Sequence, residues 1–198
     1  MTGAPIRALV CSREGLEAPD LMLGWIPMLT EPSPRGPRIS RQSGLTLYAH
    51  AMRPESKGHV HIAAADARRP PAINFNFLSS PPDAVTVHAV RIAREITTAL
   101  AMTPLQMNEV APGANRTTDN EILDWVKQAA ETTYHPVGTC KMRLTQWQSS
   151  MPSFASHGIA GLRVADASIM PTLTSGNTNA PSIMIGEKAA DMVLNAAI

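Results

Sequence analysis

The segment GLTLYAHAMRPESKGHVHIAAADARRPPAINFNFL, residues 44–78, decides the predicted fold class. It contains runs in which apolar and polar side chains alternate, at residues 44–54, 59–65 and 66–78. In the first run Leu45 and Leu47 alternate with Thr46 and Tyr48, and the last run places Ile73, Phe75 and Phe77 on one face with Asn74 and Asn76 on the other. Such alternation is typical of strands with one buried face. We therefore expect an antiparallel sheet with short turns and one face on a core.

Two helices are predicted after the sheet. Residues 79–100 carry apolar side chains at helical spacing, after two prolines suited to a helix start: Val85, Ala89, Ile92, Ile96 and Leu100. Thr118 and Glu121 form a capping-box pattern that opens a second helix, which ends near Glu131. Residues 1–43 look irregular, with a strand or buried loop at PDLMLGWIPML, residues 19–29. The predicted class is α+β, an antiparallel sheet with flanking helices.

Composition excludes several classes of protein. The chain has 198 residues, of which 44% are hydrophobic, so it can bury a sizeable core. Its net charge of +1 indicates no nucleic-acid partner and no anionic membrane surface. No stretch is long and apolar enough to predict a transmembrane helix, and no secretory signal is expected. Two cysteines, Cys11 and Cys140, form no disulfide framework, which favours a reducing, cytoplasmic location.

One histidine stands in an unusual setting, in TTYHPVGTCKM, residues 132–142. Pro136 disfavours helical geometry for His135, and Gly138 permits a tight bend or a close approach of another group. Histidine suits general-base catalysis because its unperturbed pKa lies near physiological pH. The spacing alone favours the other interpretation, a buried histidine in a loop before a strand. His59 and His61 share one face of a strand, but no carboxylate or cysteine accompanies them, so we predict no metal site.

A second block, GLRVADASIMPTLTSGNTNAPSIMIGEKAADMVL, occupies residues 161–194. It predicts a short buried strand that ends near Asp166, then a turn, then an amphipathic helix. Asn179 suits the N-cap of that helix, with Pro181 in its first turn. The first-turn amides of a helix lack intrahelical partners and its dipole is positive there, so this end can face negative charge.

These two blocks, in this order and at this separation, resemble the C-terminal part of the glucose–methanol–choline (GMC) family of FAD-dependent alcohol oxidoreductases, closest to its bacterial alcohol and choline dehydrogenase-like branch. The resemblance extends back to about Gly15. It implies a substrate-binding region at 1–131 and a catalytic, flavin-facing segment at 132–198. It also implies oxidation of a primary alcohol to an aldehyde, with hydride transfer to flavin N5.

The resemblance assigns roles to individual residues. His135 matches the general base that takes the hydroxyl proton, and Asn177 matches the second catalytic position, which holds the alcohol oxygen. The residues that match positions near the flavin are Tyr134, Asp166, Ala167, Thr178 and Asn179. Cys140 lies in the motif, and a small buried thiol is the role expected for it.

The chain departs from the family in lacking a G-x-G-x-x-G loop for the FAD pyrophosphate. It therefore looks like the last third of such an enzyme, with the N-terminal FAD-binding half as its missing partner and a small-molecule alcohol as substrate. Three readings stay open: an enzyme active only when that half is supplied, a non-catalytic small-molecule-binding or interaction module, and a decayed gene fragment. Oxygen or a quinone would accept the electrons, and a quinone would bring the protein to the membrane periphery.

The second departure is residues 143–156, RLTQWQSSMPSFAS, where the family has residues similar to DPMAVVD and LRVHG. Plausible codons for Leu144–Ser156, read in another frame, encode DPMAVVDAQLRV. Our hypothesis is a compensated frameshift, with one base lost near Arg143 and one gained near Ser156. Such a segment should pack poorly. The nucleotide sequence is the test, because codons that cannot yield the second reading would end the hypothesis.

Overall fold

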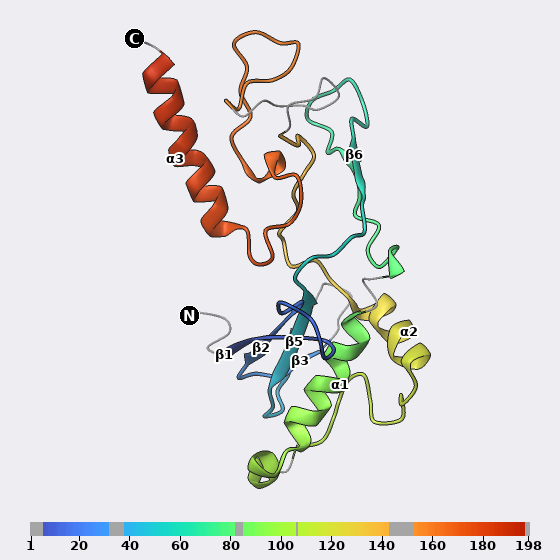
Figure 1. Cartoon of the computed structure of the whole chain (residues 1–198). Coiled ribbons are helices and arrows are strands. Elements are labelled where there is room, and N and C mark those ends of the chain that lie inside the picture. Colours follow the sequence, from blue (N-terminus) through green and yellow to red (C-terminus); the bar gives the residue numbers. More distant parts are fainter. Residues whose placement is uncertain (1–5, 32–37, 82–84, 106, 143–152, 197–198) are drawn as a thin grey trace. The chain divides into compact units, whose positions relative to one another are not determined.

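The computed structural model describes residues 6–31, 38–81, 85–105, 107–142 and 153–196 (Figure 1). The chain forms two compact units, each built from two separate stretches. The first comprises Met1–Met52 and Ser80–Glu131, and the second Arg53–Ser79 and Thr132–Ile198. Antiparallel strands and helices occur together, which confirms the predicted α+β class. The division into a substrate region at 1–131 and a catalytic segment at 132–198 concerns function and stays a prediction.

The first unit is built on a three-stranded antiparallel sheet in the order β1-β2-β5. Its strands are β1 (Ile6–Val10), β2 (Leu21–Ile26) and β5 (Thr46–Ala51). The central strand β2 lies in PDLMLGWIPML, where a strand or a buried loop was expected, and its Leu21 and Leu23 are fully buried. Such complete burial is expected of a central strand rich in long apolar side chains. Gly24 faces Tyr48 across the sheet and leaves room for the tyrosine ring, which a Cβ at that position would overlap.

Polar contacts hold the short connections between the strands of the first unit. Asp20 accepts hydrogen bonds from the backbone N–H and the hydroxyl of Ser12, both at 2.7 Å, and so closes the β1–β2 loop. The two-residue strands β3 (Thr30–Glu31) and β4 (Arg38–Ile39) pair with each other. Hydrogen bonds from Ser40 and Arg38 lower the pKa of Glu31 at this pair.

The helices of the first unit follow the sheet in sequence, and the first of them packs on it. Helix α1 (Val85–Thr98) packs against β5 and β2, and α2 (Asp119–Ala129) packs against α1 (Figure 1). The helix expected over 79–100 is thus confirmed, but it ends at Thr98. The predicted apolar position Leu100 is exposed, because a 3₁₀ helix, η2 (Leu100–Leu105), begins there and turns the side chain out of the stripe. Among the described helices none is long and apolar enough to cross a bilayer.

Polar side chains fix the start of α2 and hold the connection between α1 and α2. The capping box predicted at Thr118 and Glu121 is present, and N–H groups of Thr118 and Thr117 lower the pKa of the Glu121 carboxyl. Arg94 of α1 pairs with Glu109 through two hydrogen bonds of 3.0 and 2.9 Å, which raises the pKa of Arg94. Arg94 also donates to the carbonyl oxygens of Gly113 and Arg116, so one side chain fastens the α1–α2 connection.

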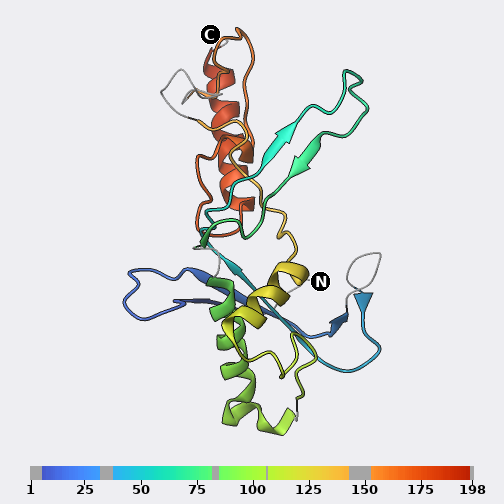
Figure 2. The ribbon, with the colours of Figure 1, turned by 90° about the vertical axis from the view of Figure 1, so that its right-hand side faces the viewer.

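In the second unit, β6 (His59–His61) and β7 (Ala72–Asn74) form a separate two-stranded hairpin (Figure 2). The expectation that residues 44–78 build one continuous sheet is therefore wrong, because β5 pairs with β2 instead of β6. Side-chain alternation indicates strands but does not say which strands pair. Gly58 opens the hairpin where only glycine fits, since a Cβ there would lie 1.9 Å from the carbonyl oxygen of Asn74.

The alternation predicted through Phe77 stops at Asn74, where β7 ends. Asn76 has a φ of 54°, which is left-handed backbone and incompatible with a strand. Its side-chain amide donates to the carbonyl oxygen of Lys57 and to the hydroxyl of Ser79, both at 3.0 Å. These side-chain bonds replace the ladder of a strand. The rings of Phe75 and Phe77 consequently stack on each other, with centroids 5.1 Å apart.

The C-terminal part of the second unit packs around one apolar cluster. A 3₁₀ helix, η3 (Ala167–Ile169), and the long helix α3 (Asn179–Ala196) contribute to it. The buried members of this cluster, called here the C-terminal core, are Phe154, Ile169, Met170, Ile185 and Ala189. Figures 1 and 2 show α3 as a single rod beside the loops that lead into it.

Phe154 belongs to the segment for which a frameshift is hypothesised. Residues 143–152 of that segment lie outside the described residues, but Phe154 is 5% exposed and sits in the C-terminal core. The expectation of poor packing is therefore wrong at this position. The backbone here is paired with residues 162–164, because Phe154 O accepts from Val164 N at 2.9 Å and Ser156 N donates to Leu162 O.

Candidate functional site

His135 lies in an irregular loop whose two ends are held by hydrogen bonds. On its N-terminal side, Tyr134 N donates to the hydroxyl of Thr132 at 3.0 Å. On its C-terminal side, Cys140 N donates to Ser168 O and Met142 N to Ile169 O, which ties the loop to η3 and the C-terminal core. Gly138 has a φ of 86°, and a Cβ there would come within 3.3 Å of Met170 O. The glycine therefore allows both the tight bend and the close approach of another group that were expected at this position.

Both ring nitrogens of His135 contact consecutive residues of a distant segment. The Nδ2 of Asn177 lies 2.6 Å from Nε2 of His135. The hydroxyl oxygen of Thr178 lies 2.9 Å from Nδ1, and the backbone N–H of Thr178 donates to the same atom at 3.4 Å. The expected juxtaposition of His135 and Asn177 is thus present in the structure. A half-buried imidazole with one nitrogen beside an amide donor can exchange a proton with a bound hydroxyl group.

The start of α3 presents Asn177 and Thr178 to the imidazole. The carbonyl oxygen of Thr178 accepts from Ser182 N at 3.0 Å and from the Ser182 hydroxyl at 2.6 Å, so Thr178 occupies the N-cap position. The prediction that Asn179 is the N-cap is wrong by one residue, because Asn179 is already the first helical residue. The side chain of Thr178 does not cap its own helix, since it contacts His135 instead.

The turn before α3 is fastened by a residue that the sequence did not single out. Arg53 Nη1 donates to the hydroxyl of Ser175 at 2.6 Å, 122 positions further along the chain. Ser175 itself has a φ of 60°, a left-handed conformation uncommon for a residue with a side chain. The contact between Thr178 and His135 was also missed, because Thr178 was assigned to the flavin. Separations of 122 and 43 residues left no local pattern that could indicate these two contacts.

The structure does not bring the other predicted site residues into this hydrogen-bonded group. The Tyr134 side chain is 81% exposed. Asp166 is the exposed N-cap of η3, where its carboxylate accepts from Ser168 N at 2.7 Å. Ala167 packs against the C-terminal core, and Asn179 is exposed in the first turn of α3. Their assignment to the flavin stays a prediction.

Other titratable clusters in the described part of the chain are sparse. His59 and His61 lie side by side on β6, with ring centroids 4.7 Å apart and both exposed. Among the described residues, no group of three or more His, Cys, Asp or Glu side chains gathers as a metal site would require. Cys11 is exposed and Cys140 is half-buried, each as a thiol.

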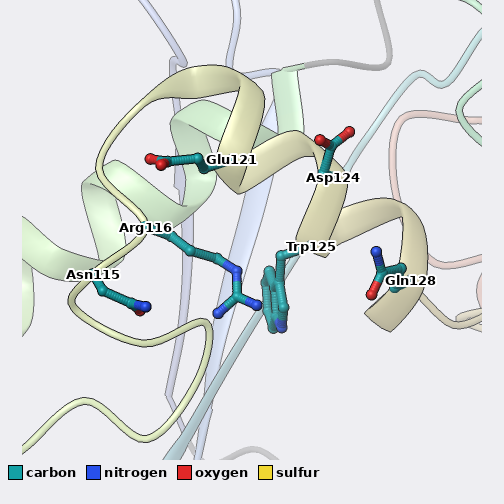
Figure 3. A pocket seen from close by; sticks show the side chains of 6 residues that line it. All are labelled: Asn115, Arg116, Glu121, Asp124, Trp125 and Gln128. Atoms are coloured by element: carbon teal, nitrogen blue, oxygen red, sulfur yellow. The ribbon is translucent and has the colours of Figure 1, made fainter.

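An open pocket of about 310 Å³ lies on the first unit, over the start of α2 (Figure 3). It is lined by Asn115, Arg116, Glu121, Asp124, Trp125 and Gln128, none of them a predicted site residue. Figure 3 shows the Arg116 side chain pointing toward the Trp125 ring. The main polar groups are already engaged, because Glu121 accepts from Thr117 and Thr118 N–H groups and Arg116 donates to the Pro112 carbonyl. The His135 group is therefore the stronger candidate site.

The chain is similar to known proteins over most of its length. A family model described as GMC oxidoreductase matches residues 54–186. The oxygen-dependent choline dehydrogenase of Brucella ovis is 38% identical over 190 residues, which are 94% of this chain and 34% of that protein. The chain thus spans about a third of the length of the curated relatives it matches.

Solved structures resemble the fold over nearly the whole chain. Pyridoxine 4-oxidase from Mesorbium loti superposes with a TM-score of 0.85 and 22% identity, over 96% of this chain and 37% of that one. An FAD-dependent oxidoreductase from Chaetomium thermophilum superposes with a TM-score of 0.75 and 27% identity, over 91% of this chain and 29% of that one.

Proposed function

The chain belongs to the GMC oxidoreductase family, and on that premise we propose that it is the C-terminal, substrate-facing part of an FAD-dependent enzyme that oxidises a primary alcohol to an aldehyde. The observation that carries the proposal is the contact of both His135 ring nitrogens with Asn177 and Thr178, at 2.6 and 2.9 Å. A base and an amide donor at adjacent points are what removal of a hydroxyl proton requires.

In this proposal His135 and Asn177 both contact the hydroxyl oxygen of the alcohol. Nε2 of His135 takes the hydroxyl proton, and the Asn177 amide donates a hydrogen bond to the same oxygen as negative charge develops on it. Preorganised donors aimed at developing charge are among the largest contributions to catalysis. The 2.6 Å contact between the two groups supports this, because it places the base and the amide donor next to each other.

The residues around the start of α3 fit a flavin. The first turn of α3 contains no acidic residue, so the positive end of the helix dipole is uncompensated by its own side chains. The exposed Asn179 and the first-turn amides would face the cofactor, together with Tyr134, Asp166 and Ala167 as the family resemblance suggests. FAD, when bound, supplies the acceptor for the hydride that leaves the carbinol carbon. The protein's part is to hold the alcohol and remove its proton.

We propose an N-terminal FAD-binding half as the partner of this chain. Helix α3 packs Ile185 and Ala189 into the C-terminal core but leaves large apolar side chains exposed within its unit: Ile183, Met184, Val193 and Leu194. A helix that is apolar on more than one side is normally covered on each of them. About two thirds of the length of such a relative lies outside the region that this chain matches, and that part would supply the protein that covers this face.

The experiment is a chimera in which this chain replaces the matching third of the Brucella ovis choline dehydrogenase. We expect the purified chimera to show flavin absorbance and to lose it under anaerobic conditions on addition of an alcohol, tested with choline, an aliphatic and an aromatic alcohol. The remaining two thirds of that enzyme, without this chain, are the control. Oxygen uptake compared with reduction of a quinone identifies the acceptor. A chimera that binds FAD but is reduced by no alcohol would favour a non-catalytic binding module.

A further inference from the structure

Thr178 has an unusual combination of burial and contacts. Of the described residues it is the one polar residue in the buried class, at 6% exposure. Its carbonyl oxygen is occupied by Ser182, so its backbone position is set by α3. Its hydroxyl oxygen is 2.9 Å from Nδ1 of His135. A buried hydroxyl contacts a group with which it can exchange a hydrogen bond, because leaving it unpaired would cost free energy.

The contacts of the imidazole determine where its proton resides. The neutral ring carries one proton, so one nitrogen donates and the other accepts. Nε2 lies 2.6 Å from the Nδ2 of Asn177, an atom that can only donate, so Nε2 is the acceptor. The proton is then on Nδ1, and Nδ1–H donates to the Thr178 hydroxyl oxygen. The Thr178 backbone N–H, also a donor, approaches Nδ1 at the longer distance of 3.4 Å and so competes weakly.

We propose that Thr178 is a positioning residue that holds His135 in the Nδ1–H tautomer, so that Nε2 stays unprotonated. Its lone pair accepts from Asn177 until the hydroxyl group of an alcohol takes the place of that donor. The tautomer is inferred from the shorter of the two donor contacts, 2.6 Å at Nε2 against 3.4 Å at Nδ1, and its use in catalysis rests on the proposed function. In the opposite tautomer Nε2 would bear the proton and could not take one from an alcohol. The partner is a neutral hydroxyl, so it orients the ring without adding a charge beside it, in contrast to the carboxylate of a Ser-His-Asp triad.

The tautomer can be measured on the full chain without flavin or substrate. Selective ¹⁵N-histidine labelling and NMR, at a pH where imidazoles are neutral, distinguish protonated from unprotonated ring nitrogens, and H135Q assigns the signals of His135. We expect Nδ1 in the protonated range and Nε2 in the unprotonated range. T178V, which loses the hydroxyl at similar shape, should move the two signals toward each other or exchange them. T178S should restore the wild-type shifts, and the signals of exposed His88 should not move in any variant.

Two results would overturn the inference. One is a wild-type His135 with the proton on Nε2, which decides the matter even if T178V fails to fold. The other is a folded T178V with wild-type shifts. In the chimera, T178V should lower kcat by about 10–100-fold with little change in KM, by analogy with the partners of metal-bound histidines. An inactive chimera with an Nδ1–H ring rejects the proposed function alone, and an active chimera with an Nε2–H ring rejects this inference alone.

Discussion

Replacing His135 with glutamine is expected to lower kcat for alcohol oxidation by roughly 10²–10⁴-fold, the range that a positioned general base contributes. Glutamine keeps a polar group of similar size next to Asn177, but its amide cannot accept a proton near neutral pH. The KM should change less than kcat, because the proton moves only on the way to the transition state. Steady-state kinetics of the chimera, with and without the substitution, give the measurement.

The matched control for this variant is His88→Gln, the same substitution at an exposed position of α1. It should leave kcat and KM at the values of the unsubstituted chimera. The flavin absorbance of both variants should also equal that of the parent, which separates loss of proton transfer from loss of cofactor. An H135Q chimera with full flavin content and unchanged kcat would remove His135 from the catalytic role.

Replacing Ile185 with alanine is expected to destabilise the second unit by about 2–5 kcal/mol, the usual cost of truncating a buried isoleucine. Ile185 is 5% exposed and packs with Ile169 and Met170, so its removal leaves a cavity in the C-terminal core. Hydrogen exchange of the α3 amides reports this loss as reduced protection, and it does so locally even if the first unit stays folded.

Ile183→Ala is the matched control, because it removes the same atoms two residues away at a position that is 59% exposed. In the chain alone its effect should stay within about 0.5 kcal/mol, as for most surface substitutions. In the chimera the same substitution should cost more, since the proposed N-terminal half covers that face of α3. Equal losses of protection from I183A and I185A in the chain alone would contradict the assigned packing of the helix.

The pairing of strands shows where sequence patterns stop being informative. Residues 46–51, 59–61 and 72–74 were all expected as strands and all are strands. Their alternation could not reveal that β5 joins β2 and β1, because every strand with one apolar face satisfies the same pattern. The partner of β5 is instead chosen by packing, since β2 supplies the fully buried Leu21 and Leu23. At Asn76, the competing side-chain hydrogen bonds ended a strand that alternation alone would have extended.

The sequence by itself determined the α+β class, the helices with their capping box at Thr118, and the choice of His135 and Asn177 as the candidate pair. The class and the helices depend on local residue type and spacing, and the candidate pair depends on the resemblance of two sequence blocks to the GMC family. Only the tertiary structure decided that the hydroxyl of Thr178 contacts Nδ1 of His135, at 2.9 Å, instead of capping its own helix. The same holds for the hydrogen bond by which Arg53 fastens the turn at Ser175. The physical reason is that these contacts join residues 43 and 122 positions apart, and packing around the C-terminal core brings them together.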